Sequence, residues 1–154
     1  MHASRSEHAV PPIEIDTLVP CAPDAAFDYF TRDIGRWWPL ARYSCSQEHA
    51  ASVQFDDGKL VETDRDGKRY EWGEVLAWER GRRLALTWHP GTPPEDALIV
   101  TVTFDAAGDG TRVKLVHSGW ERLGAKAADA RASYAGGWPT VLGRLYKDYC
   151  EGAK

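Results

Sequence analysis

YAGGWPTVLGRLYKDYC, from Tyr134 to Cys150, gives the clearest indication of the architecture, because its large apolar side chains recur at helical spacing. Steps of four, three or one residues place them in one continuous stripe: Tyr134, Trp138, Val141, Leu142, Leu145, Tyr146 and Tyr149. Pro139 lies within the stripe and lacks a backbone donor, so we expect the helix to begin anew there or to kink. A long amphipathic helix of this kind needs a sheet against which to bury its stripe.

The middle of the chain predicts that sheet. Residues 50–119 contain strand-like stretches separated by the turn signals FDDGK, RDGKR, ERGRR, HPGTPPED and AAGDG. These five turns separate six strands, and the alternating stretch IEIDTLV, Ile13 to Val19, adds a seventh. Most of the turns are short, so consecutive strands should pair antiparallel. We therefore predict an α+β fold in which a curved, seven-stranded antiparallel sheet wraps around the long C-terminal helix.

Two short helices should follow the first strand. PDAAFDYF begins with Pro23, which suits a first helical position, and a second brief helix in DIGRWW is stopped by Pro39. Trp37 and Trp38 therefore lie at a corner between the helices and the sheet. Consecutive side chains point in different directions, so we expect one of the two indoles to seal the core or the mouth of a cavity.

Length, charge and cysteine content limit the remaining possibilities. With 154 residues we expect one domain over residues 13–150, a disordered tail over residues 1–12 and a C-terminal tail over residues 151–154. The net charge of -4 argues against nucleic-acid binding. No apolar run approaches the roughly 20 residues of a membrane span.

The cysteines and the N-terminal sequence predict a cytoplasmic protein. Cys21, Cys45 and Cys150 are an odd number at unrelated spacings, which is typical of reduced thiols rather than of a disulfide framework. The polar start MHASRSEHAVPP lacks the apolar segment of a signal peptide.

Several stretches, in this order, resemble a known superfamily: FDYFT, IGRWWP, WGEVLAWERGRRLALTW, GDGTRVKLVHSGW and YAGGWPTVLGRL. They are similar to the START-like (SRPBCC) superfamily, and specifically to bacterial homologues of the heat-shock-protein ATPase activator C-terminal domain. The resemblance covers residues 13–150 and implies a helix-grip fold with a cavity between sheet and helix. Members of the superfamily use this cavity for lipids, polyketides, hormones and other apolar molecules. Some relatives are enzymes, and the namesake is a co-chaperone.

The helix-grip order makes eight residues candidates for the cavity wall: Trp37, Trp38, Trp72, Glu74, Trp88, His117, Trp138 and Leu142. His117 shares strand parity with Val113 and Leu115 and should point toward the helix and the cavity, although a neutral, hydrogen-bonded core histidine is the simpler interpretation. Unless a bulge intervenes, one face of a strand should carry an aromatic wall, with Glu74 as a polar contact. The side chains on that face are Tyr70, Trp72, Leu76 and Trp78. The same face could equally be tightly packed core or a dimer contact.

The sequence offers no motif that identifies catalytic residues, which leaves a cavity enzyme open, and we expect neither a metal nor a cofactor. The stretch around Ser44, Cys45 and Ser46 contains no GxSxG nucleophile motif. His49, His89 and Cys45 show no spacing typical of metal ligands, and GDG near residue 109 lacks the GxGxxG pattern of a dinucleotide site.

Three functional hypotheses follow. The first is that the protein binds a small, largely apolar or aromatic molecule between sheet and helix. The second is a co-chaperone-like interaction protein that stimulates a heat-shock-protein ATPase, with a chaperone as its partner. The third is a cavity enzyme of the cyclase, dehydratase or hydrolase type. In each case we expect a monomer or a homodimer.

Overall fold

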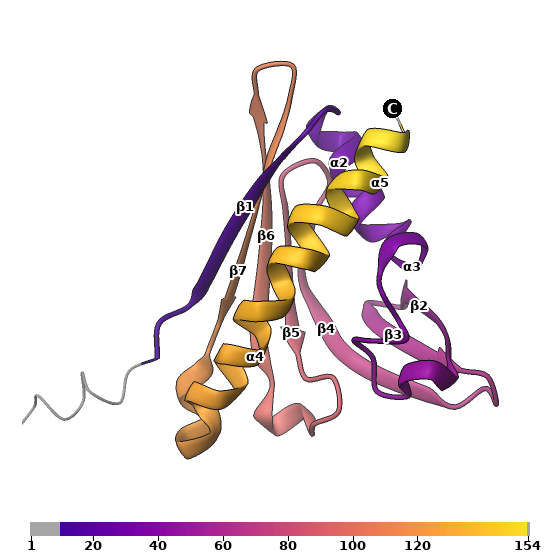
Figure 1. The fold of residues 1–154 in the computed structure, drawn as a ribbon, viewed down its shortest axis with the longest axis vertical. Helices are drawn as coiled ribbons and strands as arrows, with labels where there is room; N and C mark the ends of the chain where they lie inside the picture. The colour runs from indigo at the N-terminus through magenta and orange to yellow at the C-terminus, as the bar shows by residue number, and fades with distance from the viewer. Residues whose placement is uncertain (1–9, 154) are drawn as a thin grey trace, which may run out of the picture.

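The computed structural model describes residues 10–153, and its strands form one antiparallel sheet (Figure 1). The spatial order is β1-β7-β6-β5-β4-β3-β2, so that β1 pairs with the last strand and every other pair is consecutive in sequence. The predicted seven-stranded antiparallel sheet is confirmed, with these bounds: β1 Ile13–Val19, β2 Ala50–Asp56, β3 Lys59–Asp64, β4 Arg69–Glu79, β5 Arg83–Trp88, β6 Leu98–Ala107 and β7 Gly110–Ser118.

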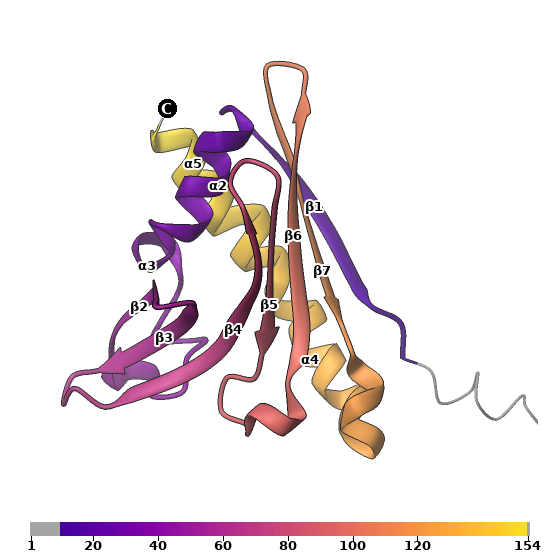
Figure 2. The same cartoon turned by 180° about the vertical axis from the view of Figure 1, so that it is seen from behind.

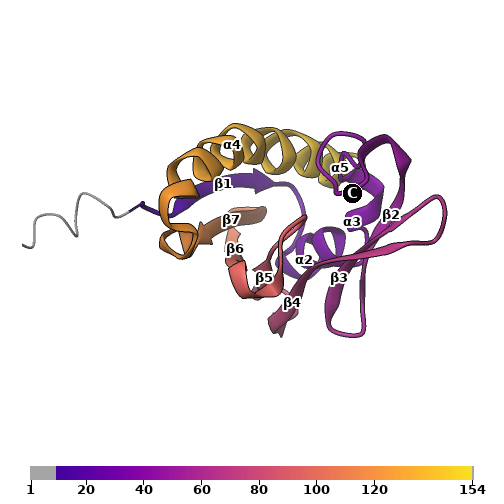
Figure 3. The same cartoon turned by 90° about the horizontal axis from the view of Figure 1, so that it is seen from below.

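Two short helices follow β1, as the sequence predicts. They are α2, Pro23–Thr31, and α3, Ile34–Trp37, and both lie within the curve of the sheet (Figure 3). Proline occupies the first turn of α2, where its missing donor costs nothing. The inner side of α2 buries Phe27 and Phe30 beneath the sheet. Short 3-10 helices lie in three of the connections: Gln47–His49 before β2, Pro94–Asp96 between β5 and β6, and Trp120–Lys126 between β7 and α4.

The C-terminal helix is longer than its apolar stripe predicts. It comprises α4, Ala127–Thr140, a π-helical turn, Val141–Tyr146, and α5, Lys147–Ala153. The helix crosses one face of the sheet diagonally, in front of the strands in Figure 1 and behind them in Figure 2. Pro139 lies inside α4 and is followed directly by the π-turn. The helix therefore widens after the proline instead of beginning anew, because a wider turn can absorb the missing hydrogen bond.

The apolar stripe is buried against the sheet and α2, which gives the fold its core. Leu142 is wholly buried, as is Tyr146, whose hydroxyl donates a 2.6 Å hydrogen bond to the carbonyl oxygen of Ala26. A buried phenol needs such a partner, and this one ties the helix to α2. The half-buried Tyr149 donates to the Asp33 carboxylate at the edge of this core.

Strand β4 departs from the predicted alternation. Its pairing shifts register between Leu60 and Val61 on one side and again between Val75 and Ala77, so one parity does not run through the strand. Trp72 points inward and is fully buried, but two of its expected companions on the same wall are largely exposed: Leu76 and Trp78. The predicted wall of four side chains is therefore wrong beyond the bulge.

The structure describes residues 10–12 of the predicted N-terminal tail and residues 151–153 of the predicted C-terminal tail. Residues 1–9 of the predicted N-terminal tail lie outside the described residues. The carbonyl oxygens of Pro11 and Pro12 accept hydrogen bonds from the Arg131 guanidinium, at 2.6 and 3.0 Å, which attaches this stretch to α4. At the other end, residues 151–153 continue α5 and do not form a tail.

Candidate functional site

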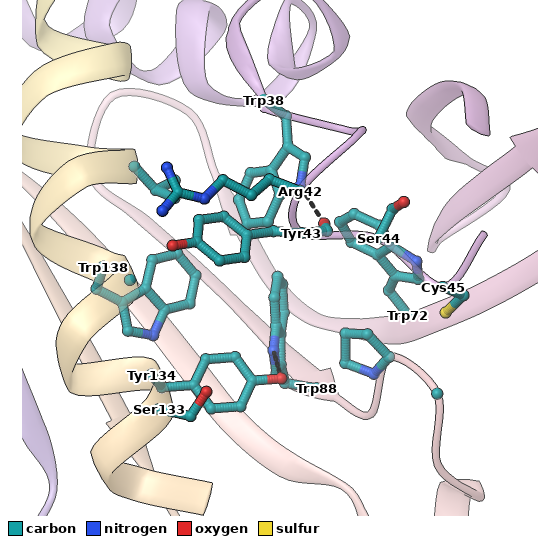
Figure 4. A pocket seen from close by; sticks show the side chains of 14 residues that line it. Trp38, Arg42, Tyr43, Ser44, Cys45, Trp72, Trp88, Ser133, Tyr134 and Trp138 are labelled. Carbon is teal, nitrogen blue, oxygen red and sulfur yellow. Dashed lines mark hydrogen bonds between the residues drawn. The ribbon is translucent and has the colours of Figure 1, made fainter. Parts of the chain in front are cut away.

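A cavity of about 400 Å³ lies between α4, strands β4 and β5, and the segment that follows α3. In Figure 4 the ring of Tyr43 lies across the space from Trp88 and Tyr134, with Trp138 beside them on the helix. Aromatic rings dominate the wall, with four indoles and two phenols: Trp38, Tyr43, Trp72, Trp88, Tyr134 and Trp138. The cavity occupies the position between sheet and helix that the sequence predicts.

The adjacent indoles of Trp37 and Trp38 separate into core and cavity. Trp38 lines the cavity, and its Nε1 donates a 2.7 Å hydrogen bond to the carbonyl oxygen of Tyr43. Trp37 does not line it; its ring packs between Phe30 and Tyr146 in the core. Trp37 ends α3, and Trp38 has an extended backbone ahead of Pro39, so the two side chains diverge.

The remaining indoles of the wall contact one another directly. The ring centroid of Trp88 lies 5.5 Å from that of Trp138, 5.9 Å from that of Trp72 and 6.0 Å from that of Trp38. Trp88 also donates from Nε1 to the hydroxyl of Tyr134 at 3.2 Å. Tilted and edge-on contacts of this kind hold the rings in fixed orientations, so the wall is preorganised.

A buried carboxylate, Glu62 of β3, supports this wall from behind. It accepts hydrogen bonds from Trp72 Nε1 at 2.9 Å, from the backbone N–H of Cys45 at 2.7 Å and from the backbone N–H of Ser46 at 2.9 Å. The hydroxyl of Ser46 is a further donor. Burial raises the pKa of Glu62, but the hydrogen bonds from Ser46, Cys45 and Trp72 outweigh it and leave the pKa below its usual value. Glu62 is therefore an ionised group that holds an indole and a loop together.

His117 lies behind the cavity wall rather than on it. It is wholly buried on β7, where Trp120 and Tyr134 pack against its ring at 4.3 and 4.7 Å between centroids. Nδ1 accepts a 3.0 Å hydrogen bond from Trp138 Nε1. Burial lowers the pKa of His117 to about 3, so the ring is neutral and serves as a core residue.

Two other candidates from the sequence do not line the cavity. Leu142 is in the apolar core, one turn beyond Trp138. Glu74, expected as the polar contact of the cavity, is exposed to solvent because it follows the β4 bulge, and its backbone N–H donates to the hydroxyl of Thr87. The buried carboxylate near the wall is Glu62 instead.

The cavity also contains residues that the sequence reasoning missed. Arg42, Tyr43 and Cys45 come from the irregular segment after Pro39, and Ser133 lies one position before the predicted stripe. No periodicity marks such a loop, and only its place between two tryptophan-bearing elements could have drawn attention to it.

The cavity offers weak means for covalent chemistry. Burial, followed by the nearby charge of Glu62, raises the pKa of the Cys45 thiol to about 11, so it is a poor nucleophile at neutral pH. Burial likewise raises the pKa of the Tyr134 hydroxyl. What the arrangement does best is to surround a flat apolar molecule with aromatic surface.

A separate polar cluster lies near the hairpin between β3 and β4. His49, Asp64 and Asp66 place one ligand atom each within 4.8 Å of one another. Asp64 already accepts hydrogen bonds from the N–H groups of Asp66 and Lys68 and from the Tyr70 hydroxyl, so its carboxylate stabilises the turn.

Over residues 10–153, none of the helices is both long and apolar enough to cross a membrane.

One known protein family matches most of the chain. The family model described as Activator of Hsp90 ATPase homolog 1-like protein matches residues 20–148. The chain belongs to this family. The predicted resemblance is thereby confirmed, and it extends from the end of β1 to α5. No curated protein matches the chain.

The solved structures similar to this AHSA1-like chain include a synthase, a resistance protein and another AHSA1-like protein. An anthrahydroquino-γ-pyrone synthase, Txn09, solved with SUM, is 29% identical, with a TM-score of 0.56 over 79% of this chain and 85% of that one. CalC, a self-sacrificing resistance protein from Micromonospora echinospora, is 25% identical, with a TM-score of 0.69 over 93% and 96%. An AHSA1-like protein from Aeromonas hydrophila, 21% identical with a TM-score of 0.61 over 92% and 93%, shares the fold.

Proposed function

We propose that this AHSA1-like protein binds a planar aromatic molecule in the cavity between α4 and the sheet. The observation that carries the proposal is the wall of four indoles and two phenols around a space of about 400 Å³. That volume lies within the usual range of small-molecule sites, about 300 to 1,000 Å³. Aromatic faces offer a flat ligand both apolar contact and favourable stacking.

The shape of the cavity favours a small ligand over a long lipid chain. Its sheet side ends at Trp72 and Trp88, and the neighbouring void beneath Trp38 and Trp138 holds only about 10 Å³. A long acyl chain would have to displace core side chains, which are close-packed and costly to move. A compact ring system can lie within the existing space.

A relative supports the same class of ligand. The synthase that is 29% identical to this chain is named for an anthrahydroquino-γ-pyrone, which is a fused aromatic system. The likeness supports a ligand of that general kind, while the contacts that differ between the two chains would set its identity.

Binding of a neutral naphthalene dye tests the proposal. Prodan absorbs where tryptophan emits, so we expect saturable energy transfer from the wall indoles at about one site per chain. Ser133 is an exposed helix residue at the cavity, and Ser133→Trp should fill the space and reduce binding at least about tenfold. Ala132→Trp, at the neighbouring exposed position outside the cavity, is the matched control and should bind as the wild type does. Equal binding by both variants, or none by native protein, would contradict the proposal.

A protein partner is a second candidate, favoured by one observation. Leu76 and Trp78 are 56% and 48% exposed, and a groove of about 320 Å³ runs beside Trp78, Phe55 and Val75. Exposed aromatic side chains of this kind are common at protein interfaces. If the protein stimulates a heat-shock-protein ATPase through this face, Trp78→Ser should abolish the stimulation and leave prodan binding intact.

A further inference from the structure

The cavity lining carries a single charged side chain, Arg42. The remaining lining residues are aromatic, aliphatic, hydroxyl-bearing or thiol-bearing, and none is a carboxylate. This is unusual for a chain with a net charge of -4, in which acidic side chains outnumber basic ones. Among the described residues, Arg42 is therefore the one cation at the cavity of an acidic protein. The ionised Glu62 lies behind the wall, with its oxygens already bound by Trp72, Cys45 and Ser46.

The guanidinium of Arg42 has no carboxylate within ion-pair distance anywhere in the part of the chain that the structure describes. Six other arginines of this part of the chain form ion pairs, including Arg80 with Asp28 at 2.7 Å and Arg112 with Asp16 at 2.9 Å, whereas several more lack one, so what distinguishes Arg42 is its place at the cavity. The contact recorded for Arg42 is with the ring of Tyr43, 5.6 Å from Cζ to the centroid. Its donors remain available for an acceptor outside the protein.

The backbone on both sides of Arg42 is held in place. Before it, the carbonyl oxygen of Pro39 accepts from the N–H groups of Arg42 and Tyr43. After it, the N–H group of Cys45 donates to Glu62. The side chain thus starts from a fixed point, and Figure 4 shows it running alongside Tyr43 toward the C-terminal helix.

We propose that the ligand is an aromatic acid: its rings lie among the indoles, and a carboxylate or phenolate oxygen remains at the mouth, where Arg42 binds it. This inference rests on the proposed function and names the class of molecule for the same site. A guanidinium matches the geometry of a carboxylate and can donate two parallel hydrogen bonds to it. An aromatic cation would meet the same group with repulsion.

Three naphthalenes of matched size test the inference by isothermal titration calorimetry: 2-naphthoate, 2-naphthalenemethanol and 2-naphthylmethylammonium. Arg42 is exposed, so its contribution should resemble that of a surface ion pair of about 1 kcal/mol, which corresponds to about fivefold in Kd. We expect the wild type to prefer the carboxylate to the alcohol by about fivefold and to bind the ammonium compound most weakly. Raising the NaCl concentration from 20 to 500 mM should reduce the preference, because salt screens an exposed pair.

Arg42→Gln should reduce the ratio of carboxylate to alcohol affinity to about one and remove its dependence on salt. The matched control is Arg82→Gln, which makes the same change of charge at the exposed β4–β5 hairpin and should keep the wild-type ratio. Two results would overturn the inference and leave the proposed function standing. One is equal affinity of the wild type for the carboxylate and the alcohol, and the other is a preference for the carboxylate that remains in Arg42→Gln. Binding of none of the three compounds would overturn the proposed function and the inference together.

Discussion

Nε1 of Trp138 donates a 3.0 Å hydrogen bond to Nδ1 of His117, and this bond joins the C-terminal helix to β7 behind the cavity. An indole N–H can only donate, so Nδ1 must accept and the proton of the neutral imidazole is on Nε2. Nε2 is buried and finds no hydrogen-bond partner among residues 10–153. Protonation of Nδ1 would break the bond and place a charge in apolar surroundings.

Stability should therefore depend on pH through His117. Burial lowers its pKa to about 3 in the folded protein, against about 6.5 for a histidine in the unfolded chain. Between these two pKa values the unfolded chain binds a proton at this position and the folded chain does not. The stabilisation is fully present above pH 6.5 and is lost as the pH falls toward 3. Between pH 7 and pH 5 the loss should be about 2 kcal/mol. The measurement compares urea unfolding of the wild type with that of His117→Phe, and the difference between them should shift by that amount; parallel pH profiles would contradict the assignment.

Two substitutions of Trp138 separate its hydrogen bond from its bulk. Trp138→Phe keeps a ring in the wall but leaves His117 Nδ1 without a donor, which should cost about 1 to 3 kcal/mol. Trp138→Ala also removes the contacts with Trp38 and Trp88 and should cost about 3 to 5 kcal/mol. Urea denaturation with an unchanged m-value measures both. A loss below about 1 kcal/mol for Trp138→Ala would show that the indole does not anchor the helix.

The architecture could be predicted from the sequence because its signals are local. The alternation in Ile13–Val19 and the turn residues between later strands mark the sheet, and the stripe that includes Trp138 marks the face of the helix. Each of these patterns follows from the period of one element and its burial on one side. The order of elements then suffices for the helix-grip arrangement.

The cavity could be predicted only in part, because its remaining features depend on contacts between distant residues. The β4 bulge opposite Leu60 and Val61 reverses the expected position of Glu74, and its local signal is Gly73, because a glycine inside a strand often marks a bulge or a close backbone approach. Glu62 lies in the stretch KLVETD, where a carboxylate would ordinarily face solvent. Its partners are Trp72, ten residues later, and Cys45 and Ser46, at separations of 17 and 16 residues. Only the folded chain reveals that these donors converge.

Close approach of β4 and β5 makes Gly73 sensitive to substitution. A Cβ atom at this position would lie 1.7 Å from the carbonyl oxygen of Thr87, so Gly73→Ala must separate the two strands beside the cavity. We expect a loss of about 3 kcal/mol or more in the free energy of unfolding. Gly136→Ala is the control, because nothing lies within 4 Å of its added Cβ in α4, and it should stabilise the protein by about 0.5 to 1 kcal/mol. Similar effects at the two positions would contradict the tight β4–β5 contact.

Glu62→Gln should weaken the wall of the cavity. The carboxylate accepts from the indole of Trp72, from two backbone N–H groups and from a hydroxyl, whereas an amide presents two donors of its own. At least one existing donor would then face another donor, and we expect a cost of about 1 to 3 kcal/mol. Urea unfolding at pH 7 measures the loss. An unchanged free energy of unfolding would mean that the Glu62 carboxyl is not ionised, or that the segment with Cys45 and Ser46 readjusts without loss of stability.

Glu62→Gln should also make the thiol of Cys45 more reactive. Its pKa is raised to about 11 by burial first and by the charge of Glu62 second, so removal of that charge and loosening of the segment should both lower it. The thiolate fraction at pH 8 grows about tenfold for each unit by which the pKa falls, and the reaction with Ellman's reagent should accelerate accordingly. Cys21 and Cys150 are buried and should remain slow in the folded protein. Adding Cys45→Ser to Glu62→Gln should therefore remove the fast phase. If Glu62→Gln leaves the reaction rate unchanged, burial alone suppresses the reactivity of the Cys45 thiol. If a fast phase remains in the double variant with Cys45→Ser, Glu62→Gln instead unfolds the core around Cys21 and Cys150.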